Sequence, residues 1–339
     1  MTLTTQIQDA ARKALLNVAG PVAAEAVLTH RRLSLGSEAS EVVRVSARFA
    51  GRRGKPQTIT FVVKHLQGRT RREATIYRDL VATHASAIAP RLLDVQDGQA
   101  ASFLVVEAIN QAMAWPWQYL DLTAVLLRQL GQFHVETMQS MLPLTDWDYE
   151  GELAVSAAET LARLEHFRYY EDLRPLARHA RMLDRVVSNL ARLRGALLDE
   201  STFNQRPIHG DLHPGNAMVR RGIDRRPVMI DWGRTRPGSP LEDVSSMLQS
   251  LRFFEPSALQ RHDLLLKEYL TGLGRDRRID DATRGAYWVA GASNALAGAL
   301  NVHLLTVMDA SRNPRQRRRA FLVARDWLRV IRRAHAWAF

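Results

Sequence analysis

The chain of 339 residues contains no cysteine. Disulfide bonds, thiolate metal sites and cysteine nucleophiles are therefore excluded, and nothing in the composition requires an oxidising compartment. Glycine and proline are scarce, with 19 and 13 residues, and the chain has no internal repeat or low-complexity tract, which excludes disordered and fibrous classes. We expect a globular protein of one large or two medium domains, located in the cytoplasm.

Long hydrophobic runs are also nearly absent. The N-terminal residues contain no apolar signal core. One stretch of twenty residues, 289–308, has no charged side chain and is long enough to cross a bilayer. However, it carries Ser293, Asn294, Asn301 and His303 and is rich in alanine and glycine. We therefore expect a helix buried inside a helical domain, and no membrane partner.

Lysine is rare, although the chain is strongly basic. Only four of the 47 basic residues are lysine, and the formal net charge is +12. Clustered cations bind nucleic-acid phosphates, but the arginines are spread along the chain and are densest in one run, 312–333, at helical spacing. We interpret this run as a solvated terminal helix and expect no nucleic-acid partner.

Strand and helix patterns divide the chain. Strand signals occur at residues 41–49, 58–66 and 102–107, and helical periodicity occurs at 71–82. Longer helical patterns span 120–141, 152–169 and 173–200, a strand-rich island follows at 207–232, and the rest from 243 is helical. We predict an α+β fold of two lobes: a small antiparallel-sheet lobe with one helix at 1–107, a hinge at 108–118, and a mainly helical lobe at 119–339.

The strand-rich island carries the strongest chemical signal. It reads IHGDLHPGNAM at residues 208–218 and VMIDWG at 228–233. Asp211 and Asn216 therefore lie in a Pro- and Gly-containing loop, and Asp231 ends the next strand. Carboxylate and amide oxygens suit magnesium held together with substrate phosphates. A free carboxylate beside them can accept a hydroxyl proton.

This loop resembles the catalytic loop of the protein-kinase-like superfamily. Its sequence is most similar to that of the aminoglycoside phosphotransferase and choline kinase-like family. The resemblance implies a protein-kinase-like fold and transfer of the ATP γ-phosphoryl group, with Mg, to a hydroxyl or amino-alcohol substrate. It implies that Asp211 is the catalytic base and that Asn216 and Asp231 hold the metal. The His209 imidazole would brace the backbone around Asp231, and we expect Asp243 to cap the following helix.

The resemblance also implies nucleotide contacts in the sheet lobe. Lys64 is one of the four lysines and lies in the apolar strand pattern FVVKHL. It would contact the α- and β-phosphates of ATP and pair with Glu73 on the next helix. The other expected nucleotide-binding residues are Gly36, Ser37 and Ser40 in the phosphate-covering turn, and Glu107 and Ile109, whose backbone would contact adenine.

Two alternatives stay open at this point. One is a kinase-like protein that binds nucleotide or RNA without catalysis. The other is a metal-dependent hydrolase that uses His209, Asp211 and His213 as an H-x-D-x-H cluster together with Asp231. The hydrolase leaves Asn216 and Lys64 without a role.

The acceptor is not specified by the sequence, nor are the choice between ATP and GTP and the oligomeric state. A polycationic acceptor would need carboxylates around it, and the overall positive charge opposes its approach. Acidic residues are available in the helical part of the chain at Glu150, Glu152, Glu255, Glu268, Asp280 and Asp281.

Overall fold

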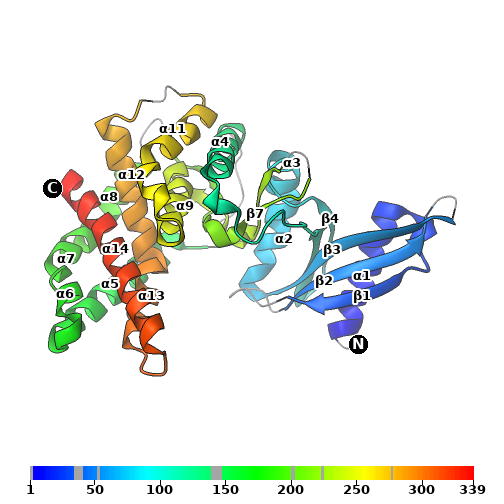
Figure 1. Ribbon diagram of the computed structural model, residues 1–339, viewed down its shortest axis with the longest axis horizontal. Helices are drawn as coiled ribbons and strands as arrows, with labels where there is room; N and C mark the ends of the chain where they lie inside the picture. The colour runs from blue at the N-terminus through cyan, green and yellow to red at the C-terminus, as the bar shows by residue number, and fades with distance from the viewer. Residues whose placement is uncertain are drawn as a thin grey trace. The chain divides into compact units, whose positions relative to one another are not determined.

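The computed structural model describes residues 3–33, 41–51, 54–138, 147–199, 203–222, 225–275 and 278–339 (Figure 1). They form two compact units. The first unit comprises Met1–Glu136 with Gly215–Thr235, and the second comprises Thr137–Pro214 with Arg236–Phe339. The lobe boundaries expected at residues 107 and 118 stay a prediction.

The first unit contains a five-stranded antiparallel sheet in the order β1-β2-β3-β5-β4. Its strands are β1 (Val27–Arg32), β2 (Glu41–Ala50), β3 (Pro56–Gln67), β4 (Leu92–Asp97) and β5 (Ala101–Glu107). The predicted strands at 41–49, 58–66 and 102–107 are confirmed as β2, β3 and β5. β1 gave no signal because five of its six residues are exposed, which leaves no apolar alternation to detect.

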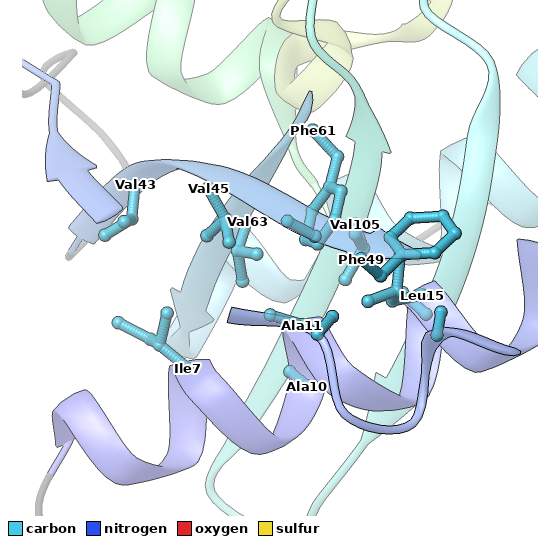
Figure 2. Packing of buried hydrophobic residues seen from close by; sticks show 14 residues of the cluster. Ile7, Ala10, Ala11, Leu15, Val43, Val45, Phe49, Phe61, Val63 and Val105 are labelled. Carbon is cyan, nitrogen blue, oxygen red and sulfur yellow. The ribbon is translucent and has the colours of Figure 1, made fainter. Parts of the chain in front are cut away.

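The hydrophobic core of this unit lies between the sheet and the helix α1 (Leu3–Ala19). Ile7, Ala11 and Leu15 recur at helical spacing on the face that meets the sheet, where Val45 and Val63 are buried (Figure 2). This packing orders the strands that position Lys64.

The predicted helix at 71–82 is confirmed as a continuous helical segment: α2 (Arg72–Ile76), a π-turn (Tyr77–Val81) and α3 (Ala82–His84). The unit also contains α4 (Leu120–Glu136) and a hairpin of β7 (Ala217–Val219) and β8 (Pro227–Met229). The strand-rich island is thus divided, since its first strand, β6 (Arg206–Ile208), pairs with β9 (Arg236–Gly238) in the second unit.

The second unit is mainly helical. Its helices are α5 (Tyr149–His166), α6 (Arg174–Ala177), α7 (Ala180–Ser188), α8 (Leu190–Asp199), α9 (Pro240–Phe254), α10 (Ser257–Gln260), α11 (His262–Gly272), α12 (Asp281–Asn294), α13 (Leu300–Met308) and α14 (Pro314–Ala338). The helix expected at 173–200 is instead three helices, because the chain leaves helical geometry around His179 and Asn189.

The apolar stretch at 289–308 forms α12, a π-turn (Ala295–Ala299) and α13. Within the described ranges, no helix has the length and hydrophobicity that a bilayer crossing requires. The arginine-rich run lies on α14, whose opposite face buries Val323, Trp327 and Ile331 beside α12 and α13 (Figure 1). The terminal helix is therefore solvated on one face only.

Candidate active site

Three charged side chains meet in the first unit. β3 places Lys64, α2 places Glu73, and Asp231 follows β8. The Lys64 Nζ lies 2.7 Å from Glu73 Oε1 and 2.9 Å from Asp231 Oδ1. Glu73 is almost fully buried, whereas the Asp231 side chain is 44% exposed. The sequence assigned all three residues to one nucleotide site. The structure brings them together although Lys64 and Asp231 are 167 positions apart in the chain.

The Lys64 ammonium group lies between two carboxylates. Burial of the ammonium group opposes its charge, but the carboxylates of Glu73 and Asp231 outweigh burial and raise the pKa of Lys64 above its usual value. Lys64 is therefore a cation at neutral pH. Of the two carboxylates that Lys64 binds, Asp231 is the one that is exposed to solvent.

The backbone at Asp231 is held in an uncommon conformation. Its φ of 65° and ψ of 63° lie in the left-handed region, which non-glycine residues rarely adopt. The next residue, Trp232, is fully buried, donates from Nε1 to the Met229 carbonyl at 3.0 Å and meets the Phe133 ring edge-on. Arg72 donates to the Gly233 carbonyl at 2.8 Å. These contacts on both following residues stabilise the orientation of Asp231.

Asn216 lies at the same end of the β7–β8 hairpin. The Ile230 N–H donates to the Asn216 carbonyl at 2.9 Å, which places the two chain segments side by side just before Asp231. An amide oxygen and an exposed carboxylate are among the hard oxygen ligands that Mg²⁺ prefers.

The segment after β5 contacts this hairpin. Glu107 forms an ion pair with Arg220, and the Ala112 N–H donates to the Val219 carbonyl at 2.8 Å. Partial burial favours the neutral acid, but the Arg220 guanidinium and the Arg91 N–H lower the pKa of Glu107 below its usual value. The Glu107 N–H donates to the Arg91 carbonyl at 2.9 Å, so this donor is already used within the protein. The expected adenine contacts of Glu107 and Ile109 stay predictions.

The loop that carries Asp211 belongs to the second unit. Asp243 lies in the first turn of α9, is buried, and accepts from the backbone N–H groups of His209 at 2.7 Å and Gly210 at 2.9 Å. The cap position of α9 is Ser239, so Asp243 braces the loop instead of capping the helix. Gly210 has a φ of 80°, a value that favours glycine.

His209 is fully buried, and its Nδ1 accepts from the Asp211 N–H at 3.3 Å. The buried imidazole therefore supports the backbone at Asp211, whose side chain is half-buried. Its expected contact with the backbone around Asp231 stays a prediction. Gly36, Ser37 and Ser40 lie outside the described residues, so the phosphate-covering turn stays a prediction.

A second charged cluster, which the sequence did not reveal, lies in the second unit. Glu242 forms ion pairs with both Arg194 and Arg236, and Arg194 also binds Glu150 at 2.5 Å. The Arg236 guanidinium lies 3.3 Å from the centre of the Tyr149 ring. Burial disfavours the Glu242 carboxylate, but the two arginines outweigh it and lower its pKa. Arg194 and Glu242 are 48 positions apart, and no sequence motif connects the members of these ion pairs.

The sequence of residues 29–279 matches the model of a phosphotransferase enzyme family. The chain belongs to this family. The match covers more than half of the chain, and it confirms the family that the motifs around Asp211 and Asp231 indicated. No curated protein sequence matches this phosphotransferase.

Solved structures with the same fold cover nearly the whole chain. An amicoumacin kinase in complex with AMP-PNP, Ca²⁺ and Ami aligns at a TM-score of 0.60 and 14% identity, over 96% of this chain and 93% of its own. Choline kinase from Cryptosporidium parvum Iowa II aligns at 0.59 and 10% identity, over 96% and 95%. An aminoglycoside phosphotransferase from Alicyclobacillus acidocaldarius aligns at 0.51 and 14% identity, over 90% of each chain. These likenesses confirm the predicted fold class.

Proposed function

We propose that this phosphotransferase transfers the γ-phosphoryl group of ATP to the hydroxyl of a small molecule, with Mg²⁺ as the metal. The observation that carries the proposal is the Lys64–Glu73–Asp231 cluster. It holds a cation suited to phosphate oxygens beside an exposed carboxylate suited to a metal.

Each residue has a role that follows from its chemistry. Lys64, oriented by Glu73, would bind the α- and β-phosphates. Asn216 and Asp231 would hold Mg²⁺, which supplies charge neutralisation on the phosphates when it is bound. Catalysis then comes mainly from positioning and electrostatics.

Asp211 would accept the proton of the acceptor hydroxyl. The acceptor oxygen forms a bond to the γ-phosphorus while the bond from that phosphorus to the β–γ bridging oxygen breaks, which releases ADP. The backbone bonds from His209 and Gly210 to Asp243 hold the loop in place, so Asp211 needs little reorganisation before it accepts the proton.

The first experiment measures thermal stability with ATP and Mg²⁺, each alone and together, with GTP in place of ATP as a comparison. A ligand at 100 times its Kd stabilises the native state by about 2.7 kcal/mol. We expect a rise that requires nucleotide and metal together and that Asp231→Ala removes. The matched control is Asp79→Ala, which removes a carboxylate of the same 44% exposure that pairs with Arg78 instead.

Asp211→Ala separates binding from transfer. We expect it to keep the stabilisation by ATP and Mg²⁺ and to lose phosphoryl transfer by about 10²- to 10⁴-fold. Wild-type transfer rates in this variant would contradict the assignment of the base. Stabilisation by nucleotide without transfer to any acceptor would favour the non-catalytic nucleotide-binding alternative.

A further inference from the structure

A cavity of about 430 Å³ lies in the second unit, beside the loop that carries Asp211. Its volume is within the range of small-molecule sites, about 300 to 1,000 Å³. His213 lines it, and His213 follows Asp211 by two residues, so their Cα atoms are at most about 7 Å apart. The cavity therefore lies next to the proposed catalytic base.

The kink after α12 shapes one wall of this cavity. Gly298 has a φ of 141°, outside helical geometry and rarely adopted by other residues. The chain changes direction there, and Ala299, Val302 and His303 on the following turns line the cavity. The facing wall comes from α9 and α14, including Phe253 and Trp327.

The lining is apolar with a basic edge. Rings and aliphatic groups supply most of it, and no aspartate or glutamate is among the lining residues within the described part of the chain. Two of the acidic residues that could have served a cationic acceptor are used elsewhere: Glu150 binds Arg194, and Asp280 caps α12 by accepting from the Thr283 N–H.

Arg319 supplies the positive charge of the edge. Its guanidinium lies over the Phe254 ring at 5.2 Å and forms no ion pair among the residues that the structure describes. Arg312, the other lining arginine, is already paired with Asp309 at 3.1 Å. Burial and the nearby Arg319 charge lower the pKa of His303, so its imidazole is neutral at neutral pH. The cavity therefore carries about one uncompensated positive charge.

We propose that this cavity binds the phosphoryl acceptor, and that the acceptor combines an apolar body with one anionic group, such as a carboxylate. An anion beside Arg319 gains a charge-assisted bond next to an apolar wall. A polycation would meet Arg319 without a carboxylate among the described lining residues, and the net charge of +12 would oppose its approach. The identification of the bound molecule as the acceptor rests on the proposed function, whereas its anionic character rests on the cavity alone.

Three fluorescent probes with the same dansyl ring test this charge preference: dansylglycine is an anion, dansylamide is neutral and dansylcadaverine is a cation. We expect the wild-type protein to bind dansylglycine at least about tenfold more tightly than dansylcadaverine, measured by fluorescence titration. Equal or tighter binding of the cation, or no binding of dansylglycine, would overturn the proposal.

Arg319→Gln and Arg318→Gln form a matched pair on α14. Arg318 is exposed and does not line the cavity. We expect Arg319→Gln to weaken dansylglycine binding about fivefold or more without weakening that of dansylamide, and Arg318→Gln to leave both unchanged. Equal effects of the two variants would show that dansylglycine responds to the general charge of the helix and not to this cavity.

A transfer assay separates this inference from the proposed function. Hydroxyl compounds with one apolar body, prepared as carboxylate, neutral and ammonium forms, are offered with ATP and Mg²⁺. We expect transfer to favour the carboxylate form and Arg319→Gln to reduce that preference. Transfer confined to the ammonium form would overturn the inference and leave the kinase intact. Dansylglycine binding without ATP-dependent stabilisation would leave the anion-binding cavity intact and contradict the kinase.

Discussion

The two units each contain a cluster of ion pairs, and the clusters differ in charge and exposure. The first cluster joins the Lys64 ammonium group to the carboxylates of Glu73 and Asp231, and Asp231 is 44% exposed. In the second unit two arginines face two carboxylates, so the charges balance, and the central Glu242 is 1% exposed.

This difference sets the proposed metal site apart from a cluster that satisfies its own charges. The balanced cluster satisfies its own charges, and the ring of Tyr149 covers Arg236. The Lys64 cluster includes an exposed carboxylate, Asp231, of the kind that the proposed Mg²⁺ would bind. Buried ion pairs alone therefore do not indicate function.

The largest expected effect is a loss of folding stability when the balanced cluster, Arg194, Arg236, Glu150 and Glu242, loses its central carboxylate. Glu242→Ala leaves Arg194 and Arg236 buried without their shared partner, and a guanidinium cannot lose its proton in a protein. We expect a loss of about 3 to 5 kcal/mol in the free energy of unfolding, measured by denaturant titration. Glu255→Ala, at the far end of the same helix, serves as the control and should cost little. A loss below about 1 kcal/mol would remove the distinction between the clusters.

Lys64→Met should act mainly on activity. Glu73 can take up a proton when its partner is removed, since burial raises its pKa, so its charge need not stay buried. We expect phosphoryl transfer to fall by about 10²-fold or more, with a smaller loss of stability than in Glu242→Ala. Kinetic assays measure the loss of phosphoryl transfer in both variants, and denaturant titrations measure their loss of stability. Unchanged kinetics would show that Lys64 does not contact the nucleotide.

The smallest expected effect is the response of the balanced cluster to acid. The pKa of Glu242 is lower in the folded state than in the unfolded chain, where it is about 4.3. Its contribution to stability is therefore complete above that value and is lost as the pH falls through the folded-state pKa. We expect the stability gap between wild type and Glu242→Gln to be widest near pH 7 and to narrow below about pH 4. A gap that widens on acidification would contradict the ion-pair assignment.

The candidate site was predictable where rare residues lie in distinctive patterns. Lys64 could be identified because lysine is scarce here and lies in an apolar strand, and Asp231 because it ends a strand after the HGDLHPGN loop. The pairing of Arg194 with Glu242 could not be predicted, because arginine and glutamate are common helix residues. β1 was missed because its side chains are mostly exposed, and the breaks between α6, α7 and α8 carry no strong stop signal.

The sequence by itself determined the family, the fold class and the members of the Lys64 cluster, because motif spacing and hydrophobic periodicity are contained in short windows of the chain. Only the tertiary structure decided that Asp243 braces the loop of Asp211 and that Arg319 lines an apolar cavity without an ion pair to any residue that the structure describes. The cavity is lined by residues between His213 and Trp327 that are distant in sequence, and its charge depends on which carboxylates other arginines have already bound. Such long-range pairing depends on how the helices pack, which no local pattern encodes.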